Sequence, residues 1–164
     1  MNYDLKYIKE KYNKSGYVLV KNIINKNELK KINLDLDNYI SNKISDNSNN
    51  KRQLNFTKTK EVNSMHGIDD LKSVNFLRKK NTLKKIVTSL IGKDYKNFGS
   101  ELFAKPAGQG LPVPIHQDNK YWCLNNGNAI TVWFALEKSN KNNGGIFYFD
   151  KSHLLGLFEH TPSY

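Results

Sequence analysis

The residues best suited to chemistry in this chain are His116 and Asp118, which flank Gln117 in the order His-Gln-Asp. On an extended strand the side chains alternate between two faces, so the first and last residues of an H-x-D triplet point the same way. An imidazole and a carboxylate on one face supply two members of the 2-His-1-carboxylate triad, which holds non-haem Fe(II) and leaves positions open for co-substrates. The triplet therefore predicts an iron site that still needs a third ligand. From the triplet alone, a histidine and an aspartate that cap a turn are the alternative.

The second half of the chain, which carries the triplet, has the composition of a strand-rich region. Pro-, Gly- and Asn-rich turns separate its apolar runs, and Asn142-Asn-Gly-Gly145 is a strong turn signal. The pattern predicts strands over residues 95–105, 113–121, 129–137 and 145–150.

Helical spacing of apolar residues dominates the first half of the chain. It predicts a helix over residues 3–14 that Gly16 ends, and a second helix from an N-cap at Asn25 to about Ile44. Further helices are expected over residues 69–79 and 82–91, the latter ended by Gly92. β-Branched runs predict strands over 17–24 and 54–62, and residues 45–52 form a polar, turn-rich segment.

Helices followed by a run of antiparallel-type strands indicate an α+β protein. We expect N-terminal helices packed on an incomplete double-stranded β-helix (a cupin-like jelly roll), because about six strands are predicted where a jelly roll usually has eight. The length of 164 residues allows a single domain at most. Residues 1–92 would form its helix-and-strand part, and residues 93–164 a jelly-roll part that is cut short.

Composition argues against several classes of protein. The net charge is +11, but 24 of the 26 basic residues are lysine, whereas nucleic-acid and phosphate sites favour arginine for two-pronged contacts. A chain rich in Lys, Asn and Ile is explained by A/T-rich codons, so we expect no nucleic-acid partner. No apolar run reaches the length of a membrane-spanning helix, and the N-terminus lacks a signal-peptide core. The single cysteine, Cys123, fits a reducing cytoplasm.

Several motifs together resemble the phytanoyl-CoA dioxygenase-like family of Fe(II)- and 2-oxoglutarate-dependent oxygenases. The resemblance covers residues 15–160 and depends on the order and spacing of its parts. These are Ser15-Gly-Tyr-Val-Leu-Val20 with Asn27-Glu-Leu29, Phe103-Ala-Lys-Pro106, Pro114-Ile-His-Gln-Asp118 with Tyr121, Thr131-Val-Trp-Phe-Ala-Leu136, Asn143-Gly144, and Ser152-His153 with Gly156.

The resemblance implies that His116 and Asp118 bind Fe(II) and that 2-oxoglutarate is the co-substrate. Halogenating relatives replace the carboxylate with a small residue, so Asp118 implies a hydroxylase. Trp133 and Glu101 match positions that lie beside 2-oxoglutarate in the family, and Tyr121 would face the pocket. Ordinary packing remains an alternative for Trp133 and Tyr121, and a carboxylate such as Glu101 is an odd partner for a dianion.

The chain departs from the family pattern after the Ser-His motif. The family's third ligand is a distal histidine, followed by an arginine that pairs with the far carboxylate of 2-oxoglutarate. No arginine follows Arg78 in this sequence. His153 matches the Ser-His loop, His160 has only four residues behind it, and His66 has the context of a loop residue. The chain is therefore expected to be a truncated fragment that binds Fe(II) weakly and self-associates through exposed edge strands.

For the full-length protein these features imply a dioxygenase that couples 2-oxoglutarate decarboxylation to hydroxylation of a small organic substrate by dioxygen. The alternative is a non-catalytic jelly-roll protein that binds a small ligand or a partner chain, since fold alone does not settle function. A basic nucleic-acid-binding module is a third interpretation, which the scarcity of arginine disfavours.

Overall fold

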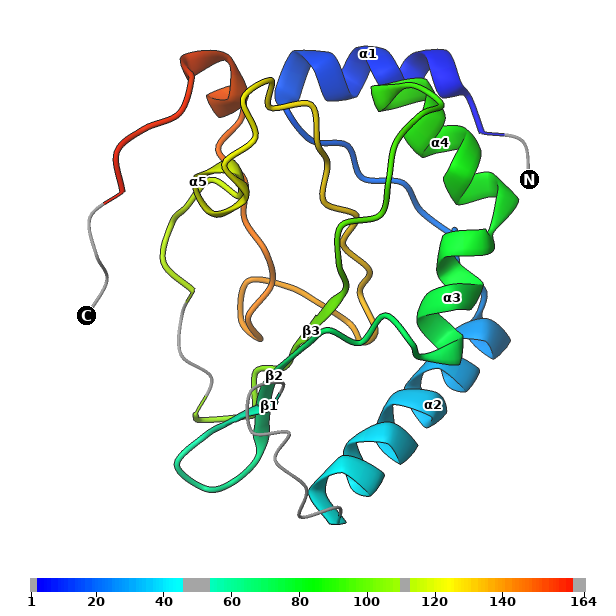
Figure 1. The fold of residues 1–164 in the computed structure, drawn as a ribbon, viewed down its shortest axis with the longest axis vertical. Coiled ribbons are helices and arrows are strands. Elements are labelled where there is room, and N and C mark those ends of the chain that lie inside the picture. The colour runs from blue at the N-terminus through cyan, green and yellow to red at the C-terminus, as the bar shows by residue number, and fades with distance from the viewer. Residues whose placement is uncertain (1–2, 46–53, 110–112, 161–164) are drawn as a thin grey trace.

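The computed structural model describes residues 3–45, 54–109 and 113–160. Most of the predicted polar segment 45–52 lies outside these residues. The elements, in chain order, are α1 (Leu5–Ser15), α2 (Lys26–Ser45), β1 (Leu54–Phe56), β2 (Val62–His66), α3 (Lys72–Lys79), α4 (Asn81–Ile91), β3 (Glu101–Phe103), α5 (Asn119–Trp122) and a 3₁₀ turn (Ser152–Leu155). Helices α2, α3 and α4 follow one another along one side of the molecule, α1 lies beside α4, and most of the second half occupies the other side (Figure 1).

The predicted helices are confirmed, and local hydrogen bonds explain where two of them begin and end. Helix α1 ends at Gly16, which adopts a left-handed conformation with φ of 84°. Helix α2 begins with a reciprocal capping box, because the side chain of Asn25 accepts a hydrogen bond from the N–H of Glu28, and Glu28 accepts one from the N–H of Asn25, both at 2.9 Å. Gly92 ends α4 as predicted.

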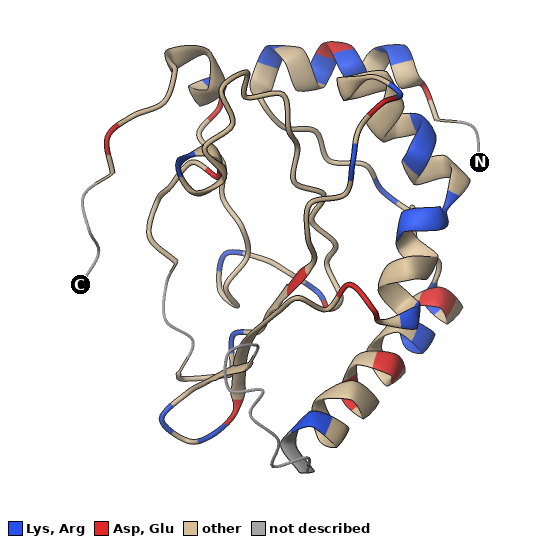
Figure 2. Ribbon diagram, in the orientation of Figure 1, with Lys and Arg blue, Asp and Glu red and all other residues tan. Residues whose placement is uncertain are grey.

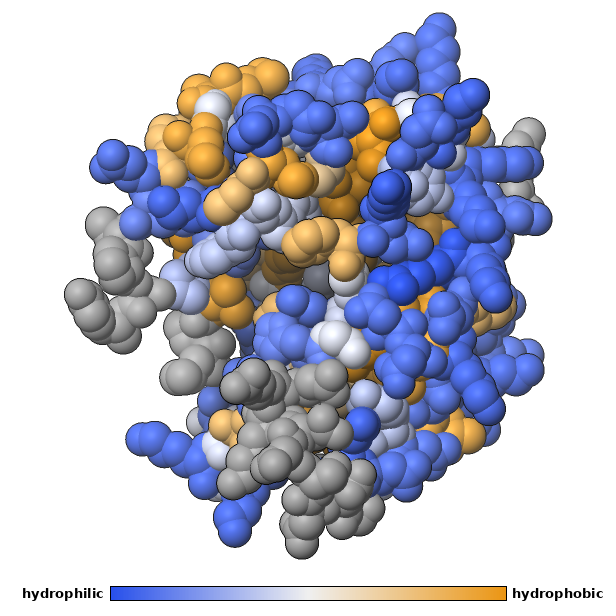
Figure 3. Space-filling model, viewed as in Figure 1, coloured by the Kyte–Doolittle hydropathy of each residue, from blue (hydrophilic) through white to orange (hydrophobic). Residues whose placement is uncertain are grey.

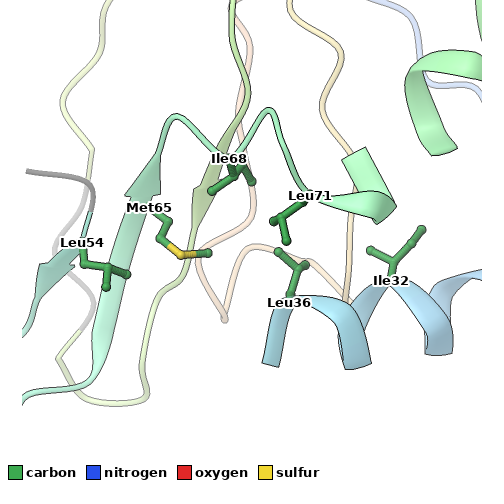
Figure 4. Close-up of a cluster of buried hydrophobic side chains, with 6 residues drawn as sticks. All are labelled: Ile32, Leu36, Leu54, Met65, Ile68 and Leu71. Atoms are coloured by element: carbon green, nitrogen blue, oxygen red, sulfur yellow. The ribbon is translucent and has the colours of Figure 1, made fainter. Parts of the chain in front are cut away.

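The sheet has three antiparallel strands in the order β1-β2-β3. Leu54, Met65 and Leu102 are successive cross-strand partners and therefore share one face of the sheet. Helix α2 covers this face with Ile32 and Leu36 (Figure 4). The six residues of this core cluster are Ile32, Leu36, Leu54, Met65, Ile68 and Leu71.

Met65 is the centre of this core, because its side chain is fully buried. An unbranched thioether fills the irregular space between a helix and a sheet more easily than a branched side chain does. The packing of α2 on this small three-stranded sheet confirms the α+β class.

One ion pair joins the start of α2 to the junction between α3 and α4. Nζ of Lys80, between α3 and α4, lies 2.6 Å from Oε1 of Glu28 in the first turn of α2. This hydrogen bond, with the one from the N–H of Asn25, holds the pKa of Glu28 below its usual range. The pair therefore stabilises the fold above the unfolded pKa of the carboxyl, and its contribution is lost as the pH falls through the lowered value. The other basic residues are spread over the helices, the β1–β2 turn and several loops (Figure 2).

Four predicted strands are not formed in the structure. Residues 17–24, 113–121, 129–137 and 145–150 contain no strand, and only Glu101–Phe103 of the predicted 95–105 is paired. The predicted strand 54–62 contains β1 and the turn that leads to β2. The physical reason is that apolar, β-branched residues favour an extended backbone, but a strand forms only when a neighbouring chain completes its hydrogen bonds.

Apolar burial is divided unequally between the two halves of the chain. All nine buried hydrophobic side chains of the described residues precede residue 88, whereas 16 of the 21 large hydrophobic side chains that are exposed follow residue 97. Apolar atoms reach the surface around the 3₁₀ turn, at the upper left of Figure 3. The second half therefore builds no apolar core of its own among the described residues.

Hydrogen bonds and one aromatic contact tie this second half to the first. The N–H of Lys151 donates to the carbonyl of Ser15 at 3.0 Å, and the ring of Tyr148 stacks on that of Tyr17 with 5.2 Å between centroids. The side-chain amide of Asn33 on α2 donates to the carbonyl of Leu136 at 3.1 Å, and Leu136 packs against the core cluster.

His153 is another such tie, and it explains the glycine at the end of α1. Nε2 of His153 lies 2.9 Å from the carbonyl oxygen of Asn13, so it donates a hydrogen bond to the C-terminal turn of the helix. A Cβ atom on Gly16 would lie 2.5 Å from Nδ1 of His153. Gly16 thus provides both the left-handed backbone and the space for this ring.

Truncation of a leucine on α2 should test the location of the core. Leu36 is 6% exposed and Leu34, two positions away on the same helix, is 59% exposed. Leu36→Ala should lower the free energy of unfolding by about 2–5 kcal/mol, because it opens a cavity in the core. Leu34→Ala is the matched control and should change it by about 0.5 kcal/mol or less. Urea denaturation followed by circular dichroism measures both, and equal losses would contradict the assigned core.

A second pair of variants should separate backbone strain from steric conflict at Gly16. Gly127 also has a positive φ (58°), but a Cβ there would meet nothing within 4 Å. Gly127→Ala should destabilise by about 1–2 kcal/mol through the left-handed backbone alone. Gly16→Ala should lose measurably more, because the new methyl group meets His153. Adding His153→Ala to Gly16→Ala should recover that excess, and additive effects in this double-mutant cycle would show that the ring is not the obstacle.

Candidate metal site around His116 and Asp118

The local backbone presents His116 and Asp118 from a turn instead of the predicted strand. Asp118 is the N-cap of α5, with helical φ and ψ of −54° and −36°. Its carbonyl accepts hydrogen bonds from the N–H groups of Tyr121 at 2.9 Å and Trp122 at 3.1 Å. Local turn hydrogen bonds therefore shape the segment that follows the triplet, where the alternation rule for strands does not apply.

The two candidate ligand side chains nevertheless meet. Nε2 of His116 lies 3.3 Å from Oδ1 of Asp118, and the side chains are 33% and 41% exposed. Bonds of about 2.1 Å from nitrogen and oxygen to a divalent ion, at right angles to each other, would separate the two donor atoms by about 3.0 Å. The observed spacing is close to that value, so the pair fits two neighbouring positions around one ion.

The protonation of His116 also suits a metal ligand. Nδ1 lies 2.8 Å from the carbonyl oxygen of Pro114, which can only accept, so Nδ1 carries the hydrogen. In the neutral ring Nε2 then has a free lone pair, which faces the Asp118 carboxylate. Two such lone-pair atoms repel unless a proton or a cation lies between them. Fixing the ring through its other nitrogen is the usual way in which proteins orient a metal-binding histidine.

Thr131 supports the carboxylate of Asp118, a role that its residue type and position do not by themselves predict. Its hydroxyl donates a hydrogen bond to Oδ2 of Asp118 and leaves Oδ1 facing His116. The contact joins the triplet to the segment that reaches the core at Leu136. One feature of the sequence could have pointed to this role. Thr131 lies two residues before Trp133, and this spacing would place both side chains on one face of an extended segment.

Tyr148 also lies near enough to feel the charge of the Asp118 carboxylate. The sequence gives no sign of this. Burial raises the pKa of the Tyr148 hydroxyl above the ordinary value, and the negative charges of Asp118 and then Tyr12 add to the effect. The ring also stacks on Tyr17. The site thus receives side chains from both ends of the described chain.

The donor set matches Fe(II), but it is incomplete in the described part of the chain. Imidazole and carboxylate are the ligand types of the 2-His-1-carboxylate triad. Among residues 3–45, 54–109 and 113–160, no group of three or more His, Cys, Asp or Glu side chains is placed to hold a metal ion. His116 and Asp118 therefore supply two donor atoms of the types that such a triad uses, without a third from the described residues.

Of the other predicted site residues, Tyr121 contacts His116, whereas Glu101 pairs with His66 elsewhere in the fold. The ring of Tyr121 makes an edge-on contact with His116, with 5.7 Å between centroids, and is 70% exposed. Trp133 is 42% exposed and follows Thr131 along the chain. Glu101 pairs instead with His66, whose Nδ1 lies 3.0 Å from Oε1 of Glu101.

His66 and Glu101 belong to a polar chain that crosses the sheet. Asn55 on β1 donates to the hydroxyl of Ser64 at 2.9 Å, and that hydroxyl lies 3.3 Å from Nε2 of His66. Since Nδ1 of His66 donates to Glu101, Nε2 accepts from Ser64 in the neutral ring. The sequence context of His66 had suggested a loop residue. The structure places His66 in strand β2 instead.

The remaining two histidines are committed to the backbone. His153 donates to α1, as described above. Nδ1 of His160 donates to the carbonyl of Phe158 at 2.9 Å, and its Nε2 accepts from the N–H of Gln117 at 2.8 Å. Neither nitrogen of His160 has a lone pair left for a metal ion, although the ring lies next to the triplet.

Two shallow grooves lie on the helical side of the molecule and not at the triplet. One of about 400 Å³ is lined by Leu5 of α1 and by residues of α4 that include Lys84 and Thr88. The other, of about 490 Å³, follows the outer face of α2. In the part of the chain that the structure describes, no helix is long and apolar enough to cross a membrane.

Comparison with protein families matches residues 12–164 to the family described as Phytanoyl-CoA dioxygenase (PhyH). Searches of curated proteins and of solved structures give no match. The family match covers nearly the whole chain and includes the His-Gln-Asp triplet, the Thr131 segment and the Ser-His loop. The chain therefore belongs to the phytanoyl-CoA dioxygenase family.

Proposed function

We propose that the protein is a 2-oxoglutarate-dependent dioxygenase that hydroxylates a small organic substrate, with His116 and Asp118 as two of the three Fe(II) ligands. Members of its family are dioxygenases in general, which supports an oxidoreductase. Bound Fe(II) would supply the redox chemistry that couples oxidative decarboxylation of 2-oxoglutarate to hydroxylation. The chain's own residues hold the metal, orient the co-substrate and exclude water.

The arrangement of His116 and Asp118 is the observation that carries this proposal. The ring is fixed through Nδ1, the carboxylate through Oδ2, and the two free donor atoms face each other at 3.3 Å. An ordinary turn-capping pair needs no such arrangement, because a capping aspartate would accept from backbone N–H groups, and the side chain of Asp118 makes no capping bond.

We further propose that the 164 residues are part of a longer oxygenase whose remaining chain supplies the distal histidine and arginine. The exposure of most large apolar side chains after residue 97 supports this, because completing strands would cover them. So does the absence of strand pairing in the described segments 113–121, 129–137 and 145–150, whose composition favours strands.

Tyr121 and Trp133 are the residues we propose for contact with the co-substrate or substrate. Tyr121 lies against the ring of His116, and Trp133 follows the residue that holds Asp118. For Glu101 the proposal changes in one respect. Because its carboxylate already pairs with His66, Glu101 would act on 2-oxoglutarate only together with that imidazole.

The experiment that tests the proposal is an anaerobic titration of the chain with Fe(II), followed by addition of 2-oxoglutarate. A complete site that binds both would give a weak visible charge-transfer band. In this chain, which lacks the distal histidine and arginine, Fe(II) affinity is the main readout and should be low. His116→Ala and Asp118→Ala should each weaken Fe(II) binding by at least about tenfold, since loss of a ligand costs more than loss of its outer-shell partner, which typically costs 10–100-fold.

Matched controls are available for both substitutions. His153→Ala removes a histidine that is committed to α1, and Asp94→Ala removes an exposed aspartate away from the triplet. Both controls should leave Fe(II) affinity within about twofold of the wild-type value. Fe(II) affinity that is equally high in His116→Ala would overturn the assignment and favour the non-catalytic alternative, a jelly-roll protein that binds a ligand or partner without redox chemistry.

A further inference from the structure

Gln117, the residue between the two proposed ligands, holds a different segment of the chain. Its side-chain Nε2 donates a hydrogen bond to the carbonyl of Gly156 at 2.8 Å, and its Oε1 accepts one from the N–H of Phe158 at 2.7 Å. A carbonyl and an N–H two residues apart on an extended chain are the groups that a neighbouring strand would engage. The carboxamide of Gln117 takes the place of that strand.

A third hydrogen bond joins the same two segments through the backbone of Gln117. Its N–H donates to Nε2 of His160 at 2.8 Å, and the His160 ring is oriented by its bond to the carbonyl of Phe158. We refer to residues 156–160 as the C-terminal strap. Both the side chain and the backbone of Gln117 are therefore engaged by the strap.

These hydrogen bonds are the main link between the strap and the triplet. The side chains of Leu157 and Phe158 in the strap are 55% and 51% exposed, so apolar burial contributes little to holding it. Gly156 turns the chain out of the 3₁₀ element with φ of 80°. Loss of the Gln117 carboxamide would remove two of the three bonds at once.

We propose that Gln117 is a positioning residue, which uses the strap to hold His116 and Asp118 at the spacing that a metal ion requires. A residue whose N–H and side chain are both fixed restrains the backbone on either side, and these neighbours are the two ligands. This inference rests on the proposed function for its metal, but the restraint on His116 exists in the metal-free chain.

The test compares Gln117→Ala with Gln109→Ala in the full 164-residue chain. Gln109 is a matched control, because its carboxamide also ties two segments, through Thr59 at 2.6 Å and Glu61 at 3.3 Å, away from the triplet. Ring ¹⁵N shifts report the tautomer of His116 in the metal-free protein. Titration with Co(II), as a stable probe for Fe(II), reports the affinity of the pair.

We expect wild type and Gln109→Ala to show a single Nδ1–H tautomer for His116. Gln117→Ala should show a mixture of tautomers and should bind Co(II) about tenfold more weakly, as other outer-shell substitutions do. Gln117→Glu serves as a second variant in case Gln117→Ala fails to fold. It keeps the acceptor for Phe158 but loses the donor to Gly156, and it should show a smaller change in the same direction.

The outcomes separate this inference from the proposed function. Faster amide exchange at Phe158 in Gln117→Ala, with the His116 tautomer and Co(II) affinity unchanged, would mean that Gln117 holds the strap alone, and the inference would be wrong. If the wild-type chain binds no Co(II), the proposed metal site fails. The His116 tautomer in the metal-free variants still decides whether Gln117 positions the ring.

Discussion

The burial of Met65 between α2 and the three-stranded sheet is the interaction on which the rest of the structure depends. The buried hydrophobic side chains of the described residues all belong to the first 87 positions, and five of them cluster around this methionine (Figure 4). Apolar burial is the dominant favourable contribution to folding. The first half can therefore serve as a rigid base, and the second half takes its position from contacts with that base.

The proposed metal site is assembled from these contacts. The segment that carries Thr131 is held at Leu136 by α2. Tyr17, just after α1, stacks on Tyr148 beside the carboxylate of Asp118. Side chains separated by more than 100 positions thus surround one short turn. Because hydrogen bonds and ring contacts hold this half in place, its local stability should be lower than that of the helical base.

The chemistry of the site depends on which donors are already satisfied. Nδ1 of His116 is bound to a carbonyl and Oδ2 of Asp118 to a hydroxyl, so the remaining lone pairs face one another. The ring of His160 also lies next to the triplet, but both of its nitrogens form hydrogen bonds with backbone groups. The difference between the proposed ligand His116 and the structural His160 is the partner of each ring nitrogen, and not the distance from the triplet.

The helices and their ends were predictable because their determinants are local in the sequence. Apolar spacing, the capping box at Asn25 and the glycines at 16 and 92 act within one or two turns, so a single sequence contains the information. The His-Gln-Asp triplet and the family were also recognisable from the sequence, since they rest on residue types and order. The strands predicted at 17–24, 113–121, 129–137 and 145–150 are not formed. A strand requires a neighbouring chain segment to complete its hydrogen bonds, and the sequence does not specify which segment that is.

Only the tertiary structure decided the partners of the polar side chains. The sequence marked Glu101 as a neighbour of the co-substrate, and the fold pairs it with His66 across two strands. It marked His66 as a loop residue, and the fold places it in β2. It gave no role to Thr131 or Gln117, which the fold joins to Asp118 and to the strap. The sequence by itself determined which groups are available for chemistry. Their pairing required the fold, because hydrogen bonds between distant segments depend on how the chain packs.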